Sequence, residues 1–264
     1  MISRIGDAFS HQKRPLLVAC LVAGDPDREV SLSLMREAER CGADIIEVVM
    51  PYSDPVADGP VMQKAMQRAL RAGMTPDGLF SLLRDFRTSS GTPLLILTYA
   101  NIVVQRGIGA FYRDARAAGA DGVAVADVPL EEADPFCRAA RESGIDPVLF
   151  VSQTTSPGRL REIADRASGF LYLVAVLGVT GVRGSLNAGI GEYLGKVKEV
   201  SPLPVVPGFG IGTPDQIREL ARAGADGVIV GSAIVSEVER TLGDGSRARE
   251  AVGAKVRELA SALR

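Results

Sequence analysis

The stretches AGADGVIV (223–230) and AGADGVAV (118–125), with the looser copies CGADIIEV (41–48) and SGIDPVLF (143–150), decide the fold of this chain. Each copy places a glycine and an aspartate directly before an apolar run. Glycine commonly ends a helix in the left-handed conformation, and a short apolar run after it is typical of a buried strand. Each copy therefore predicts a junction at which a helix ends and a strand begins.

The rest of the chain extends this alternation of helix and strand. Helical spacing of apolar residues occurs in 30–41, 111–119, 135–144 and 214–224. Apolar runs predict strands at 16–22, 45–49, 94–99, 122–127, 147–152, 170–176, 203–209 and 227–231.

Strands this uniformly apolar are covered on both faces, so we expect one (β/α)8 TIM barrel domain over residues 1–264. A doubly wound parallel sheet is the alternative. Against it, the first strand is followed by AGDPD (23–27) and not by Gly-x-Gly-x-x-Gly.

Composition limits the functions that this chain can have. Lys and Arg number 30 against 32 Asp and Glu, a net charge of −2, which argues against binding to nucleic acid or an anionic membrane. Three widely spaced cysteines and a single histidine, His11, give no metal-ligand pattern and no Ser-His-Asp triad. We therefore expect a cytoplasmic protein without a metal site, in which carboxylates would carry any proton transfer.

Two glycine-rich loops follow the last two predicted strands. PGFGIGTPDQI (207–217) leads into a helix with Thr213 as its expected cap, and VGSAI (230–234) ends the eighth strand. Glycines let backbone N–H groups approach an anion, and loops seven and eight of this barrel commonly bind phosphate. The alternative is that these glycines only form tight turns, but their occurrence at both strands favours a small phosphorylated ligand.

The segment EVVMPYSDPVADGP (47–60) concentrates acidic residues at the end of the second predicted strand. Glu47 lies inside an apolar run, where burial favours a raised pKa and proton exchange near neutral pH. A buried ion pair would be the structural explanation for Glu47, and Asp54 and Asp58 could simply form turns. A strand carboxylate and a loop carboxylate beside a phosphate pocket favour catalysis.

The sequence resembles the tryptophan synthase alpha subunit family. The motif PYSDPVADGPVMQ (51–63), preceded by a strand glutamate, is the most specific match. Order and spacing also hold for AGDPD (23–27), TYAN (98–101), DGVAVADVPLEEAD (121–134), GVTG (178–181), PGFGIGTPDQI (207–217) and GADGVIVGSAIV (224–235). The resemblance implies a carbon-carbon lyase of tryptophan biosynthesis that cleaves indole-3-glycerol phosphate to indole and glyceraldehyde 3-phosphate without a cofactor or metal of its own.

The resemblance also implies roles for single residues. Glu47 would be the general acid/base, Asp58 would accept the indole N–H, and Tyr172 would be an active-site tyrosine, although the sequence equally allows a core aromatic there. The phosphate would contact the backbone at Gly181, Gly210 and Ser232, with Gly231 allowing approach. Tyr99 and Phe209 would line the indole pocket, whereas Pro51 and Asp54 would face a partner beta subunit carrying pyridoxal phosphate.

By the same resemblance we expect an alpha-beta-beta-alpha heterotetramer, with mobile active-site loops at about 51–60 and 177–190. Three stretches depart from the family pattern and could alter loop motion or coupling to the partner: Val48-Val49-Met50, Tyr99-Ala100-Asn101-Ile102 and Ala175-Val176-Leu177. Two rival functions remain. One is another phosphosugar barrel enzyme such as an epimerase or isomerase, and the other is a regulatory subunit with a degenerate site.

Overall fold

The computed structural model describes residues 3–175 and 189–264 of the chain. Its strands all run parallel and agree with the predicted positions to within two residues, apart from the end of the sixth prediction, which falls outside the described residues. They are β1 (Leu16–Val22), β2 (Ile45–Val49), β3 (Leu94–Thr98), β4 (Gly122–Val125), β5 (Asp146–Ser152), β6 (Leu171–Val174), β7 (Val205–Gly208) and β8 (Gly227–Val230).

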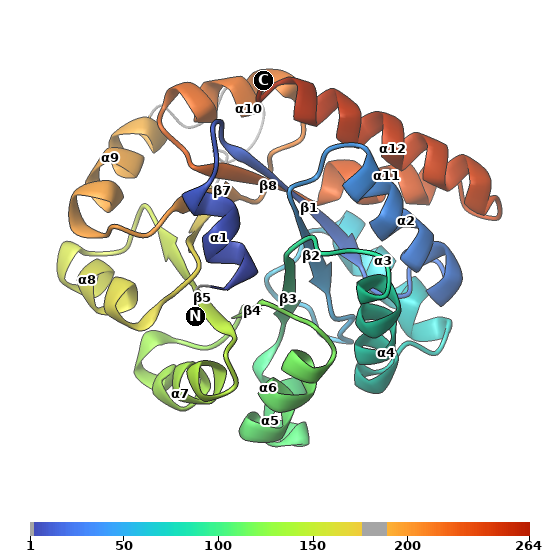
Figure 1. Ribbon diagram of the computed structural model, residues 1–264, viewed down its shortest axis with the longest axis horizontal. Coiled ribbons are helices and arrows are strands. Elements are labelled where there is room, and N and C mark those ends of the chain that lie inside the picture. The colour runs from blue at the N-terminus through green and yellow to red at the C-terminus, as the bar shows by residue number, and fades with distance from the viewer. Residues whose placement is uncertain (1–2, 176–188) are drawn as a thin grey trace.

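Strand order follows the chain from β1 to β7, and β8 pairs with β1. At the remaining join, the backbone N–H of Asp226, which precedes β8, donates to the carbonyl of Val205 in β7 (3.0 Å). The strands therefore form a nearly closed (β/α)8 barrel, as predicted, and Figure 1 shows the helices arranged around them. A doubly wound sheet would leave its first and last strands as open edges, whereas here β1 and β8 pair with each other. That alternative is therefore excluded.

Helices connect successive strands and cover the outside of the barrel (Figure 1). They are α1 (Arg4–Ser10), α2 (Arg28–Arg40), α3 (Pro60–Arg71), α4 (Pro76–Arg87), α5 (Ala100–Arg106), α6 (Ile108–Ala117), α7 (Asp134–Glu142) after the 3-10 turn η1 (Leu130–Glu132), α8 (Pro157–Arg166), α9 (Ile190–Val200), α10 (Pro214–Arg222), α11 (Ser232–Arg240) and α12 (Gly245–Ser261). Thr213 caps α10 in a capping box with Gln216, as its sequence predicts. No helix in the described ranges is both long and apolar enough to cross a membrane.

The repeated aspartates fasten neighbouring strands together at the start of the barrel. Asp44, Asp121 and Asp226 each precede a strand, and each carboxylate accepts a backbone N–H from the first or second residue of the strand before it, at 2.8, 2.9 and 2.8 Å. A bond to a charged acceptor is stronger than a neutral one. The preceding glycines have φ values of 109°, 93° and 93°, which suit only glycine well. Three copies of the repeat are thus structural fastenings between strands, whereas in the fourth the Asp146 carboxylate accepts the hydroxyl of Ser168 (2.7 Å).

Helix α1 closes the end of the barrel where the strands begin. Its Ile5 is fully buried, and Phe9 packs against Phe170 with ring centroids 5.7 Å apart. Arg4 pairs with the buried carboxylate of Asp121 (2.8 Å). Because this end is plugged, a ligand can enter the barrel only from the opposite end, where the strands finish.

Candidate active site

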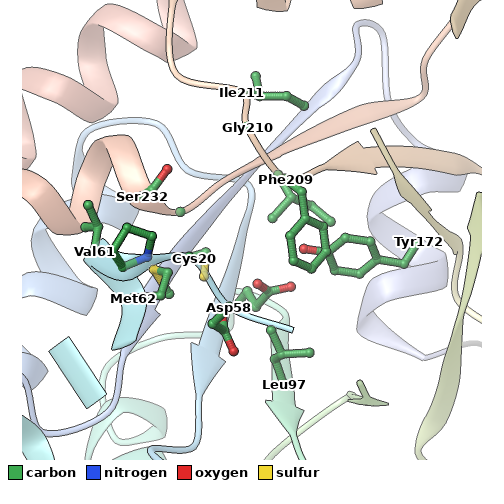
Figure 2. A pocket seen from close by; sticks show the side chains of 15 residues that line it. Cys20, Asp58, Val61, Met62, Leu97, Tyr172, Phe209, Gly210, Ile211 and Ser232 are labelled. Atoms are coloured by element: carbon green, nitrogen blue, oxygen red, sulfur yellow. The ribbon is translucent and has the colours of Figure 1, made fainter. Parts of the chain in front are cut away.

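A cavity of about 360 Å³ opens where the strands finish, at the end opposite α1. Figure 2 shows side chains from widely separated parts of the chain pointing into it, among them Asp58, Tyr172 and Phe209. Seven of the predicted site residues line this cavity: Glu47, Asp58, Tyr172, Phe209, Gly210, Gly231 and Ser232. Carboxylates, aromatic rings and glycine loops that lie far apart in sequence therefore share one space.

Glu47 lies in β2 and is fully buried. Neither of its carboxyl oxygens has a hydrogen-bond partner among the described residues. Burial raises the pKa of Glu47 to about 7; the thiol of Cys20, at the same register on β1, lowers the pKa somewhat, and the charge of Asp58 raises it. A carboxyl group with this pKa can both give and take a proton near neutral pH. No cation among the described residues pairs with Glu47, which argues against the alternative of a buried ion pair.

Because ionising the buried Glu47 costs free energy, the stability of the fold should depend on pH. Glu47→Gln should stabilise the fold by about 3 kcal/mol at pH 8, because a pKa displaced upward by burial disfavours the ionised form. Below about pH 4.5, where the carboxyl is protonated in both folded and unfolded chains, the gain should vanish. Urea unfolding of both proteins from pH 4.5 to 9 measures the difference. The difference should grow as the pH rises from 4.5 to about 7 and level off above that, and a difference that stays constant over this range would contradict the burial of an ionisable group.

Asp58 lies in the loop between β2 and α3, and its half-buried carboxyl group reaches the cavity. Its Oδ2 accepts a hydrogen bond from the hydroxyl of Tyr99 (2.5 Å). Burial raises the pKa of Asp58, and the Tyr99 hydrogen bond lowers it. Tyr99 is buried and is not among the residues that line the cavity, and its hydroxyl holds Asp58 at the cavity's edge; its place in an indole pocket stays a prediction.

Three aromatic rings lie in a row, and two of them, Tyr172 and Phe209, line the cavity. Tyr172 of β6 is buried, with its ring centroid 4.8 Å from that of Phe150 and 5.6 Å from that of Phe209. Phe209 has a φ of 69°, an uncommon value for a residue with a side chain. Tyr172 is thus both a core aromatic and a lining residue of the cavity, and its catalytic role stays a prediction.

Gly208 is required by the close approach of Tyr172. A Cβ atom at this position would lie 2.6 Å from Cε1 and 2.8 Å from the hydroxyl oxygen of Tyr172. Gly208→Ala should therefore displace the tyrosine and destabilise the fold by about 1–3 kcal/mol. Gly195→Ala is a suitable control, because this exposed glycine in α9 has open space at its Cβ and should gain up to about 1 kcal/mol. Thermal unfolding checks both, and equal midpoints for the two variants would refute the packing argument.

The two glycine-rich loops after β7 and β8, which the sequence predicts to bind phosphate, also reach the cavity. Gly210, Gly231 and Ser232 line it, and α11 begins at Ser232, so its first turn leaves backbone N–H groups without helical partners facing this region. A helix start of this kind favours an anion through its N–H groups and its dipole. Gly231 also packs closely, since a Cβ there would lie 3.2 Å from Cys20 Sγ. The fourth predicted phosphate contact, Gly181, lies outside the described residues.

Several lining residues are missing from the sequence prediction. They are mostly apolar: Cys20, Val61, Met62, Leu97, Ile211 and Ile229. Strand register could have revealed Cys20, because Cys20 on β1 lies opposite Glu47 on β2, and partners in register point to the same side of a sheet. The remaining ones are indistinguishable from core residues in the sequence.

Pro51 and Asp54 differ in their exposure to solvent. Asp54 is exposed, whereas Pro51 is buried by its own chain. The expectation that Pro51 itself faces a partner therefore needs correction. The exposed apolar residue of this loop is Val56, with 83% of its surface accessible. Within the described residues no cluster of three or more His, Cys, Asp or Glu side chains is arranged to hold a metal ion.

The departures from the family pattern lie mainly in the core. Val48, Val49 and Met50 are buried and extend the β2 region, with the Met50 N–H donating to the Leu97 carbonyl (2.8 Å). Ala175 is also buried, whereas Val176 and Leu177 lie outside the described residues. The larger side chains therefore occupy packed positions beside Glu47, and their effect on rate stays a prediction.

Fold and cavity together define a (β/α)8-barrel protein with two carboxyl groups and two glycine loops in one apolar pocket. Comparison with known proteins narrows this class. A family model described as tryptophan synthase alpha chain matches residues 7–264. The tryptophan synthase alpha chain of Methanoregula boonei is 46% identical over 244 residues, covering 92% of each chain. That of Methanothermobacter thermautotrophicus is 44% identical over 247 residues, covering 94% of this chain and 90% of the relative.

Comparison with solved structures points to the same family. The tryptophan synthase subunit alpha from Legionella pneumophila superposes with a TM-score of 0.91 at 34% identity, covering 99% of this chain and 98% of that one. A chain of the tryptophan synthase a2b2 complex from Pyrococcus furiosus gives 0.83 at 34% identity, covering 93% and 98%. This chain belongs to the tryptophan synthase alpha chain family, and its role is enzymatic, in tryptophan synthesis.

Proposed function

We propose that this chain is a carbon-carbon lyase that cleaves indole-3-glycerol phosphate to indole and glyceraldehyde 3-phosphate. The observation that carries this proposal is the meeting of Glu47 and Asp58 in one cavity with the Gly210 and Gly231 loops. Such an arrangement suits a substrate with a phosphate at one end and an indole ring at the other. The rival epimerase or isomerase function is set aside because the chain belongs to a different family.

The retro-aldol reaction needs three proton and charge changes. Indole C3 takes up a proton, the ring nitrogen carries positive charge in the resulting tautomer, and the glycerol hydroxyl loses its proton as the carbon-carbon bond breaks and an aldehyde forms. Glu47, with a pKa of about 7, suits the proton transfers as general acid and base. Asp58 suits the indole N–H, because a carboxylate there stabilises the positive charge.

Two different regions of the cavity suit the two ends of this substrate. Apolar side chains of Leu97, Ile229 and Phe209 offer surface to an indole ring, and the start of α11 offers N–H groups to the phosphate. Tyr172 lines the cavity beside Phe209, with the two ring centroids 5.6 Å apart, and adds to the aromatic surface offered to the indole ring. None of these roles requires a cofactor or a metal ion in this chain.

A partner beta subunit is the second part of the proposal. The relative from Pyrococcus furiosus is part of an a2b2 complex, and this chain presents exposed apolar residues at Val56 in the loop after β2 and Val104 in α5. These two segments contact one another, since Asn101 Nδ2 donates to the hydroxyl of Tyr52 (3.3 Å). We propose that a pyridoxal-phosphate beta subunit docks over this face in an alpha-beta-beta-alpha assembly.

Loop closure remains a prediction. Residues 51–60 carry Asp58 and would close over the substrate to exclude water. The second predicted lid, 177–190, lies outside the described residues except for Gly189 and Ile190. The assignment of a single domain and a cytoplasmic location likewise stay predictions.

The test is to incubate the purified chain with indole-3-glycerol phosphate, alone and with a tryptophan synthase beta subunit. We expect indole and glyceraldehyde 3-phosphate in equal amounts, released faster when the partner is present. Indole is followed by its absorbance and the aldehyde by a coupled dehydrogenase assay. No product under either condition would overturn the lyase and favour the regulatory subunit.

A further inference from the structure

The hydroxyl group of Tyr99 contacts the acidic loop at two points. It donates to Asp58 Oδ2 at 2.5 Å and accepts the backbone N–H of Ala57 at 3.2 Å. Both the carboxyl group and the backbone beside it are therefore tied to one oxygen atom. Tyr99 follows β3 directly and is the N-cap residue of α5, so its backbone is fixed by two regular elements.

The ring of Tyr99 is rigidly held. Only 1% of its surface is accessible, and it stacks on Tyr52 with centroids 5.0 Å apart and planes inclined by 28°. Asp58, in contrast, sits in a loop whose other bonds are few: its N–H donates to the Pro55 carbonyl (3.2 Å), and its own carbonyl accepts from Gln63 (2.8 Å). Of the described contacts, only the Tyr99 hydrogen bond is made to the Asp58 side chain.

The Tyr99 hydroxyl is a constant donor. Burial and the negative charge of Asp58 raise the pKa of Tyr99 far above neutral pH, so the hydroxyl keeps its proton. The bond in turn favours the ionised form of Asp58. A hydrogen bond between a fixed donor and a carboxylate both orients the acceptor and keeps it charged.

We propose that Tyr99 is a positioning residue for Asp58, which fixes the carboxylate over the cavity so that it meets the indole N–H as the transition state forms. This inference rests on the proposed function for its kinetic consequence. The contact itself is a separate claim about Asp58, and it can be tested without turnover.

The kinetic test is Tyr99→Phe, which removes the hydroxyl and keeps the stacked ring. A hydrogen bond to a charged group predicts a fall in kcat of about 10- to 100-fold. KM should change less than about threefold, because positioning acts mainly on the transition state. Tyr112→Phe is the matched control: Tyr112 is equally buried, but it lies in α6, whereas the Asp58 carboxylate is bound by Tyr99. Unchanged kcat in Tyr99→Phe, or an equal fall in Tyr112→Phe, would overturn the proposal.

The pH profile separates positioning from a general structural defect. Asp58 faces Glu47 of β2, Cys20 of β1, Tyr172 of β6 and Tyr99, which directly follows β3. The other groups titrate in both proteins and cancel in the ratio of mutant to wild-type kcat. The pH dependence of this ratio therefore reports the titration of Asp58. Without the hydroxyl the pKa of Asp58 rises, so this ratio should fall as the pH is lowered from 8 to 5. A ratio that stays constant would indicate a structural defect and overturn the proposal.

A measurement without substrate distinguishes the two claims. Carboxyl carbon NMR, with the Asp58 signal assigned by its loss in Asp58→Asn, should show Asp58 titrating about one pH unit higher in Tyr99→Phe. If the wild-type chain releases no indole but this titration still shifts, the lyase function fails and the positioning contact stands. If indole is released and the titration does not shift, the positioning proposal fails and the lyase stands.

Discussion

Replacement of Glu47 by glutamine should lower the rate of indole release by about 10²- to 10⁴-fold, the range typical of a lost general acid/base. Glutamine has nearly the same volume and fits the same buried position, but it can neither donate a proton to carbon nor take one from the glycerol hydroxyl. Glu47 is buried without a hydrogen-bond partner in the part of the chain that the structure describes, and its pKa is about 7, so its proton is the feature that the mutation removes. Steady-state indole release at pH 7.5 measures the effect.

The matched control for this variant is Glu199→Gln, an exposed position in α9. It removes the same charge from the same residue type away from the cavity, and its rate should equal that of the wild type. Because Glu47→Gln is expected to be more stable above pH 7, poor folding cannot account for a lost rate. A Glu47→Gln protein that retains more than about a tenth of the wild-type activity would refute the assignment.

Replacement of Asp58 by asparagine should have the second-largest effect, a fall in kcat of about 10²- to 10³-fold, comparable to the loss of one preorganised electrostatic group. Asparagine keeps the shape and can still accept the Tyr99 hydroxyl hydrogen bond. It loses the negative charge that would stabilise positive charge on the indole nitrogen. Single-turnover rates with excess enzyme separate this chemical step from product release.

The control for Asp58 is Asp165→Asn in α8, an exposed aspartate far from the cavity lining. Its kinetics should match the wild type. If Asp58→Asn raised KM and left kcat unchanged, Asp58 would contribute only to substrate binding, and the proposed stabilisation of the indole tautomer would be wrong.

The sequence by itself determined the barrel and the chemical character of its site. Apolar runs after Gly-Asp junctions located the strands, because helix ends and buried strands follow from local backbone preference and burial pattern. The position of Glu47 within such a run already implied a desolvated carboxyl group. The order of strands in a parallel barrel then placed the Asp58 loop and the Gly210 and Gly231 loops at one end, since all the strands finish there.

Only the tertiary structure decided which side chains line the cavity and which ones pack behind it. The sequence did not show that Tyr99 binds Asp58, because the direction of a side chain at a strand end depends on how the chain turns into the next helix. It did not show that Pro51 is buried or that Leu97 and Ile229 line the pocket, since apolar residues facing the cavity and the core look alike in sequence. Local preference fixes where strands and helices form, whereas packing between distant segments fixes which groups meet.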